Sequence, residues 1–407
     1  MSLTLTLDKS ILQQLAFREI DVLHDVYRLN IVPVLMIEIL GDLDKRKEGA
    51  SPQEAVSRLA AKIARFSSVV NVHFRDLVRC SLLYDPFSKD RVPVLSKGRQ
   101  VVTPEGEKGV IFDVAPEDSA LQRWRDKEFE SSEQILAERW RQSTRGFDIC
   151  SLRDTLKSLI PKQENIKDLS SLNSFVDMTL SDLKHQRDLL SMAVCEYIPF
   201  EEAQSVFLRW EMAGCPHLSS YAPYVFYCLR VNLFFSLGLI QDLIGPRSTN
   251  RVDMEYLYYL PFCKVFCSSD KFHKNVAPFF LDKDQQFIIG SDMENDLKEL
   301  AQQRNEEGKY PFWRESLAGR LSAQFNEQSC DELNLASNMS PEQKKLLAQF
   351  FEKKMQSSTP LEKRGFFGDD TTKFVLRKFE MRRSDPCPCG RGKSFAECCG
   401  SKDMGLI

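Results

Sequence analysis

The sequence has no glycine-rich phosphate loop of the P-loop type, no G-x-G-x-x-G fingerprint and no G-x-S-x-G elbow. An ATPase, a dehydrogenase or a hydrolase of these classes therefore has no support. An excess of positive charge is also missing, because 55 lysines and arginines stand against 58 aspartates and glutamates, a formal net charge of −3. The chain as a whole therefore has no positive potential that would attract a nucleic acid, so any nucleic-acid-binding site has to be a local cluster of basic residues.

A targeting segment and an uninterrupted membrane span are missing as well. The N-terminus, MSLTLTLDKS, has no basic region followed by a long apolar run, so we expect neither a signal nor a transit peptide, and a cytoplasmic protein. Residues 221–240 are long enough to span a bilayer, but Arg230 and Asn232 lie in their middle. A central arginine costs roughly 2.5 to 3.5 kcal/mol on insertion scales. A buried helix is predicted there, and no membrane partner.

Cysteine is sparse and without pattern over most of the chain, which predicts free thiols in a reducing compartment. These eight residues are Cys80, Cys150, Cys195, Cys215, Cys228, Cys263, Cys267 and Cys330. The remaining four of the twelve, Cys387, Cys389, Cys398 and Cys399, lie within DPCPCGRGKSFAECCG. Four thiolates so close together suit a tetrahedral metal centre, and soft sulfur ligands favour Zn²⁺. A pair of disulfides is the alternative, disfavoured by the compartment and by the strain of bridging close neighbours.

The stretch CPCGRGKSFAECCG resembles the SEC-C motif, the short zinc-binding tail of the bacterial protein-translocation ATPase and of many otherwise unrelated proteins. Lys393 and Phe395 stand where that family carries basic and aromatic residues. The resemblance implies an adaptor that contacts a protein or a ribosome and performs no chemistry. Any activity is therefore expected upstream.

At the other end of the chain, two carboxylates follow short apolar segments. LTLTLD predicts a strand that ends at Asp8, at the edge where open α/β sheets place their ligands. A helix is expected from about residue 10 to 29, then a strand at Ile31 and Val32 and a helix that Pro33 opens. That helix carries Glu38 in very apolar surroundings, where a charge needs a metal or another partner. The alternatives are that Asp8 caps a helix, and that Glu38 and Asp42 form a solvated stripe.

A second pair of carboxylates occurs in RSTNRVDMEYLYYLPFCKVFCSSDKFH, residues 247–273. A helix over about 251–259 travels roughly 13 Å and a strand over 264–267 returns a similar distance, so Asp253 and Asp270 can meet. If this strand is parallel to residues 3–7, Asp8 lies beside them. Clustered carboxylates repel one another and need a cation, and oxygen ligands select Mg²⁺ or Mn²⁺. A helix cap is the alternative for Asp270.

The order LTLTLD, IVPVLMIEIL, Asp253 and VFCSSD resembles the PIN-domain nucleases. The resemblance implies an α/β fold with a PIN-like parallel sheet flanked by helices, and a metal-dependent endoribonuclease that hydrolyses phosphodiester bonds. It makes Asp8, Asp253 and Asp270 ligands of Mg²⁺ or Mn²⁺ and Glu38 a ligand or water positioner. The RNA partner follows from the resemblance alone. Lys271 and His273 are candidates for phosphate contact, with a surface lysine and a satisfied histidine as the alternatives.

The long separation of Glu38 from Asp253 implies a large insertion. The predicted organisation is a discontinuous nuclease core at 1–45 and 220–300, a mainly helical insertion with a small β patch at 46–219, a helical extension and linker at 301–383, and the zinc knuckle at 384–407. Within the insertion, LQRWRDKEFESSEQILAERWRQSTR sets five arginines around Trp124 and Trp140. Such a mixture can bind RNA, but the interleaved acidic residues favour an amphipathic helix with packed tryptophans.

Two other functions remain open from the sequence. One is a non-catalytic adaptor with a PIN-like scaffold, and the other is a nuclease that needs a partner or a trigger.

Overall fold

In the computed structural model the protein divides into two compact units, residues 1–94 with 116–322 and residues 95–115 with 323–407. The residues that the structure describes are 3–45, 51–65, 69–83, 92–93, 98–102, 108–112, 116–304, 310 and 312–334. The four tail cysteines lie outside them.

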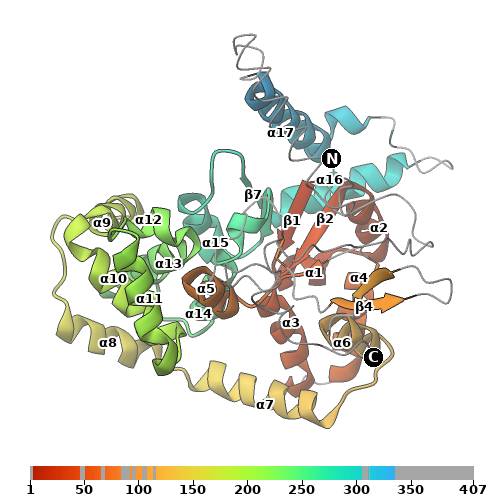
Figure 1. Ribbon diagram of the computed structural model, residues 1–407. Helices are drawn as coiled ribbons and strands as arrows, with labels where there is room; N and C mark the ends of the chain where they lie inside the picture. Colours follow the sequence, from red (N-terminus) through yellow and green to blue (C-terminus); the bar gives the residue numbers. More distant parts are fainter. Residues whose placement is uncertain are drawn as a thin grey trace. The chain divides into compact units, whose positions relative to one another are not determined.

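The first unit is built on a parallel sheet, as predicted for an α/β fold (Figure 1). Four strands form its centre and the two-residue β3 extends it, in the order β3-β2-β1-β6-β7. Their bounds are β1 Leu3–Leu7, β2 Tyr27–Ile31, β3 Val69–Val70, β6 Val265–Ser268 and β7 Gln286–Ile289. Every neighbouring pair is parallel. Most residues of β1 and β6 are buried, as expected when helices cover both faces of a sheet.

The strand order places a topological switch between β1 and β6. From β1 the chain adds β2 and β3 on one side, and much later it adds β6 and β7 on the other. The register pairs Leu7 with Cys267, so the residues that follow β1 and β6 emerge side by side. Ligands of open α/β sheets bind at the carboxyl ends of such strands.

Short helices connect these strands and pack around them. Those nearest to the site are α1 Lys9–Gln14, α3 Pro33–Leu40, α14 Thr249–Leu257 and α15 Lys271–Val276. The others of this group are α2 Phe17–Val26, α4 Pro52–Ile63, α5 Phe74–Leu83 and α16 Gly290–Gln303, and α17 Leu317–Asn334 follows them in the chain. Pro33 opens α3 as predicted, since its fixed φ suits the first helical position.

The predicted single helix over residues 10–29 is wrong. The chain leaves the helix at Leu15 and Ala16, and the Glu19 carboxylate accepts the Ala16 N–H at 2.6 Å to start α2. The next strand begins at Tyr27, four residues before the position predicted for it. Pairing of Tyr27 to Leu29 with Leu3 to Leu5 of β1 overrides the helical pattern there.

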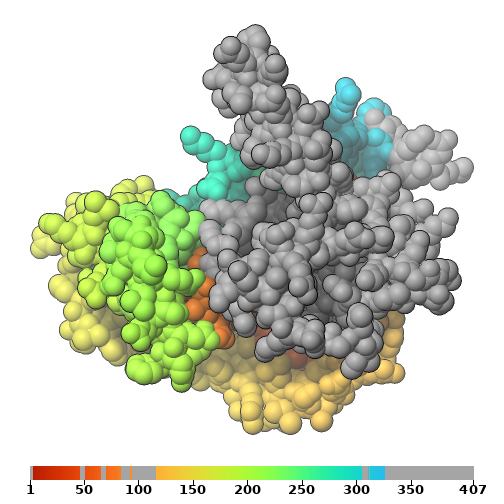
Figure 2. Space-filling model, viewed as in Figure 1, coloured from red at the N-terminus to blue at the C-terminus, as the bar shows by residue number. Residues whose placement is uncertain are grey.

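Residues 116–240 are helical. They form α6 Pro116–Arg125, α7 Ser131–Gly146, α8 Ile149–Leu159, α9 Leu169–Ser181, α10 Gln186–Tyr197, α11 Phe200–Met212, α12 Leu218–Tyr221 and α13 Pro223–Ile240. Figure 2 shows the outer surface of α8 to α12 in yellow and green. Residues 51–83, assigned to the insertion from sequence, supply α4, β3 and α5, and β3 joins the sheet. In the second unit, β4 Gly98–Val102 and β5 Lys108–Phe112 pair antiparallel.

By length and composition α13 could cross a membrane, the single such helix among the described residues, and 61% of it is buried inside the protein. It is the buried helix predicted from sequence. Its central Arg230 is partnered: the guanidinium donates to Asp177 at 2.6 Å, to Asn173 at 2.8 Å and to the Phe279 carbonyl at 2.9 Å.

Replacing Arg230 with alanine is expected to lower the free energy of unfolding by roughly 2 to 3 kcal/mol, because it removes charge-assisted bonds that join α13 to α9 and to the Phe279 carbonyl. Urea unfolding measures the change. The control is Arg187→Ala, whose side chain is 71% exposed. Equal losses for the two variants would contradict the expectation.

Candidate active site

Asp8 follows β1 and is 5% exposed. It caps α1, because its carboxylate accepts the Ile11 N–H at 3.1 Å, and it also accepts the hydroxyls of Ser10 at 2.7 Å and Ser268 at 2.6 Å. Burial by itself raises the pKa of Asp8, but the hydrogen bonds and the charge of His273, together with the two serines, outweigh it and lower the pKa. Asp8 therefore caps a helix, as the alternative from sequence had it, and its carboxylate also belongs to a larger hydrogen-bond network.

His273 is fully buried and connects Asp8 to Asp253. Its Nδ1 lies 2.8 Å from Ser268 Oγ and its Nε2 lies 2.7 Å from the Asp253 carbonyl, which can only accept. Since Ser268 gives its one proton to Asp8 and accepts the Asp270 N–H, both ring nitrogens of His273 donate. Burial disfavours this charge, but Asp8 and Asp253 outweigh it and raise the pKa of His273.

The expectation that His273 contacts a phosphate is wrong, because no part of the ring reaches the surface. Its neighbour Lys271 is exposed at the start of α15. The structure shows the alternative considered from sequence, a buried histidine whose two ring nitrogens both have hydrogen-bond partners. His273 hydrogen-bonds Ser268 and the Asp253 carbonyl beneath the acidic residues.

Asp253 is half-buried in α14, and its pKa is raised to about 7. Burial is the main cause, His273 opposes it, and the charges of Asp270, Glu38 and Asp8 add to it. The predicted carboxylates are thus close enough to act on one another. Asp270 follows β6 and caps α15 by accepting the Phe272 N–H at 2.6 Å.

Glu38 reaches the same place from α3. Its Oε2 accepts the Tyr256 hydroxyl at 2.5 Å, and burial raises its pKa against the opposing effects of Tyr256 and Lys9. The alternative of a solvated stripe with Asp42 is wrong. Asp42 is 3% exposed and pairs with Lys9 at 2.8 Å and with Arg141 at 2.6 Å.

All four predicted carboxylates, Asp8, Glu38, Asp253 and Asp270, line one cavity of about 180 Å³ together with Lys9, Ser10, Tyr256 and Ser269. A second cavity of about 280 Å³ shares Lys9, Glu38, Asp253 and Asp270 with it. The basic residues Lys45, Arg141 and Arg247 and the ring of Trp140 line this second cavity as well. The acidic cluster therefore has a basic and aromatic border.

The set of donors in the acidic cavity is all oxygen, which suits Mg²⁺ or Mn²⁺ in kind. In the described part of the chain no three His, Cys, Asp or Glu side chains form a ready cage for an ion. Mg²⁺ keeps several of its waters and is commonly held by one or two carboxylates together with substrate phosphate, so a closed cage is not required.

Ser268, Tyr256 and Lys9 were missed from sequence as members of the site. Tyr256 lies three residues after Asp253, which places the two on one side of α14. Ser268 lies two residues before Asp270, and Lys9 is next to Asp8. Periodicity and adjacency could have pointed to all three.

Fold and site together define an α/β protein with a carboxylate-lined cavity at the switch point of a parallel sheet. A family model of the SEC-C motif matches residues 383–401, which contain the four clustered cysteines. The chain therefore carries a C-terminal zinc-binding tail, although no family evidence supports a PIN domain in the rest. No curated protein and no solved structure matches the chain.

Proposed function

We propose that this protein is a metal-dependent, PIN-like nuclease that hydrolyses phosphodiester bonds in RNA and is recruited to its place of action through the SEC-C tail. The observation that carries the proposal is the convergence of Asp8, Glu38, Asp253 and Asp270 on one cavity at the carboxyl ends of β1 and β6. The raised pKa of Asp253 supports it, since perturbed carboxyl groups in a cleft are typical of functional sites.

Asp8, Asp253 and Asp270 would hold Mg²⁺ or Mn²⁺, whose charge would offset the mutual repulsion of the carboxylates. A bound ion of this kind acidifies a water and stabilises charge on the leaving oxygen. Glu38, held in place by the Tyr256 hydroxyl, would orient that water. Lys45, Arg141 and Arg247 border the adjoining cavity, where they would neutralise the phosphates on either side of the scissile bond.

The test is cleavage of labelled single-stranded RNA and DNA with Mn²⁺, Mg²⁺ or EDTA by the intact protein and by Asp8→Asn and Asp270→Asn. Cleavage that needs the metal and is lost in both variants is expected. Since both residues also cap helices, Asp168→Asn, which makes the same exchange at the cap of α9, is the matched control and should remain active. Equal activity in all variants would mean that cleavage arises elsewhere.

A non-catalytic adaptor is the second candidate, favoured by the SEC-C match itself. In that case the tail would bind a protein or a ribosome and the α/β unit would be a scaffold. No cleavage by the intact protein, alone or with cell extract, would favour the adaptor. Cleavage that appears only with extract would favour a nuclease that needs a partner.

A further inference from the structure

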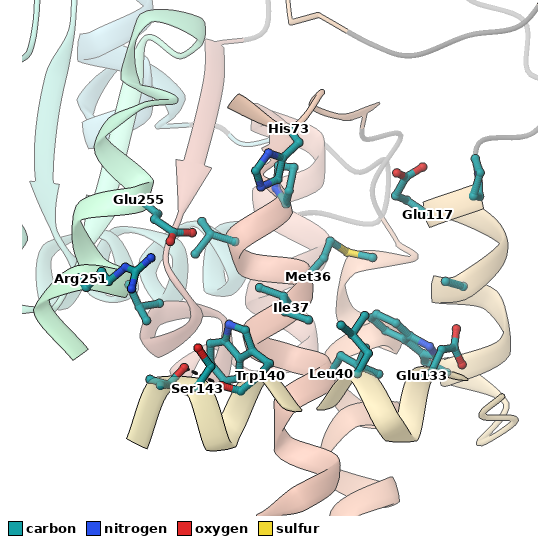
Figure 3. A pocket seen from close by; sticks show the side chains of 18 of the residues that line it. Met36, Ile37, Leu40, His73, Glu117, Glu133, Trp140, Ser143, Arg251 and Glu255 are labelled. Atoms are coloured by element: carbon teal, nitrogen blue, oxygen red, sulfur yellow. Dashed lines mark hydrogen bonds between the residues drawn. The ribbon is translucent and has the colours of Figure 1, made fainter. Parts of the chain in front are cut away.

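A groove of about 670 Å³ lies on the side of α3 that carries Met36, Ile37 and Leu40. Figure 3 shows Trp140 and Ser143 rising from α7 toward these side chains, with Arg251 and Glu255 of α14 at one end. Its volume is in the range of small-ligand sites, which combine an apolar lining with a few polar groups.

The groove continues into the acidic site. Trp140, Thr144 and Val252 line both the groove and the basic cavity, and that cavity shares Glu38, Asp253 and Asp270 with the acidic one. A chain of nucleotides could therefore have a phosphate at the carboxylates and a base in the groove. The Trp140 ring lines both cavities, and its packing against Gly41, where a Cβ would come within 2.5 Å of it, fixes its position.

Two donors on the groove residues have no acceptor. The Nε of Arg123 and the indole N–H of Trp124 are buried and, among the described residues, have no hydrogen-bond partner. Trp124 is 3% exposed, and the Arg123 guanidinium is held by its other end, which donates to Glu133 at 2.5 Å. Both donor atoms lie beneath the surface of the groove, so a ligand there would contact the apolar lining and Trp140.

We propose that this groove binds an unpaired base of the substrate strand, with the ring of the base against Trp140 and the apolar side chains of the groove around it. The proposal rests on the proposed function, because it needs a nucleic acid at the carboxylates. It explains why an aromatic ring and an apolar slot adjoin a basic cavity, since bases stack on aromatic rings while basic groups follow the backbone.

The experiment measures binding of labelled single-stranded RNA to the full chain with Ca²⁺ in place of Mg²⁺ or Mn²⁺, so that a cation offsets the carboxylates while cleavage is suppressed, and compares it with an abasic strand of equal length. Leu136→Glu puts a charge at the groove, and Ile135→Glu is the matched control. The two side chains are neighbours on α7 and are 49% and 50% exposed, but only Leu136 lines the groove.

Leu136→Glu is expected to weaken binding of the base-bearing strand roughly tenfold and to leave the abasic strand unchanged, while Ile135→Glu changes neither. Equal binding of the two strands by the intact protein, no binding of either, or equal effects of the two variants would overturn the proposal. A changed oligomeric state of Leu136→Glu with unchanged RNA binding would also overturn it, since the groove would then serve a protein. Base-dependent binding without metal-dependent cleavage would reject the proposed nuclease activity but support the proposed base site in the groove. Metal-dependent cleavage without base-dependent binding would support the nuclease activity and reject the base site.

Discussion

Asp253→Asn is expected to lose metal-dependent cleavage by about a thousandfold and, at pH 8, to be more stable than the unchanged protein. Cleavage falls because a carboxylate that would hold the ion becomes a neutral amide, and the stabilisation that the ion supplies is worth several kcal/mol. Stability rises because a half-buried charge beside Asp8, Glu38 and Asp270 is removed. An amide of the same shape carries no such repulsion.

The direction of the pH effect follows from the pKa of Asp253, which folding raises from 3.8 to about 7. A carboxyl group with a raised pKa stabilises the fold at pH values below its unfolded pKa, and this contribution is lost as the pH rises toward 7. Asp253→Asn has no carboxyl group to ionise at this position, so its stability does not fall for this reason as the pH rises. The gain at pH 8 is expected to be roughly 2 kcal/mol, half of what the full change in pKa represents, since the side chain is partly exposed.

Urea unfolding at pH 4 and pH 8 measures this difference, and the advantage of Asp253→Asn should appear only at pH 8. The control is Asp188→Asn on α10, whose side chain is 79% exposed and which should show no such dependence. Added Mn²⁺ should stabilise the unchanged protein at pH 8 more than it stabilises Asp253→Asn. A variant that is less stable at pH 8 would show that this carboxylate supports the fold and is not a strained functional group.

The zinc of the tail is expected to be lost when a clustered cysteine is replaced, as in Cys387→Ser or Cys398→Ser. Each change removes one of the four thiolates expected to bind the ion, and a segment this short is expected to need the ion in order to fold. Zinc content falls from about one ion per chain toward zero. Metal analysis of the purified protein measures this, with Cys195→Ser as the control because Cys195 is an exposed free thiol.

Loss of zinc should leave the unfolding of the first unit and the cleavage of free RNA unchanged, because the tail serves recruitment in the proposed function. Cleavage that disappears together with zinc would place the ion in the chemistry. Zinc that remains in both variants would show that the four cysteines are not its ligands.

Some features of this protein follow from short stretches of sequence. The zinc tail is one, because all four cysteines lie in a single segment and no distant residue is needed to recognise it. The parallel sheet is another, because the resemblance of the motif order to the PIN-domain nucleases implied one, and β6 pairs parallel with β1. The meeting of Asp253 and Asp270 at one cavity was also expected, because a helix and a returning strand have known lengths.

Other features required the tertiary structure. Tyr27 and Leu29 have a helical pattern locally and become a strand only because β1 is there to pair with them. The proton arrangement of Ser268 and His273 depends on Asp8, which is far away in the chain but adjacent in the sheet. The groove exists because α6 and α7 of the helical region pack near α3, a contact that no local pattern encodes. Local spacing thus determined which residues carry charge at the ends of elements, while packing between distant elements decided which of them are buried, paired or open to a ligand.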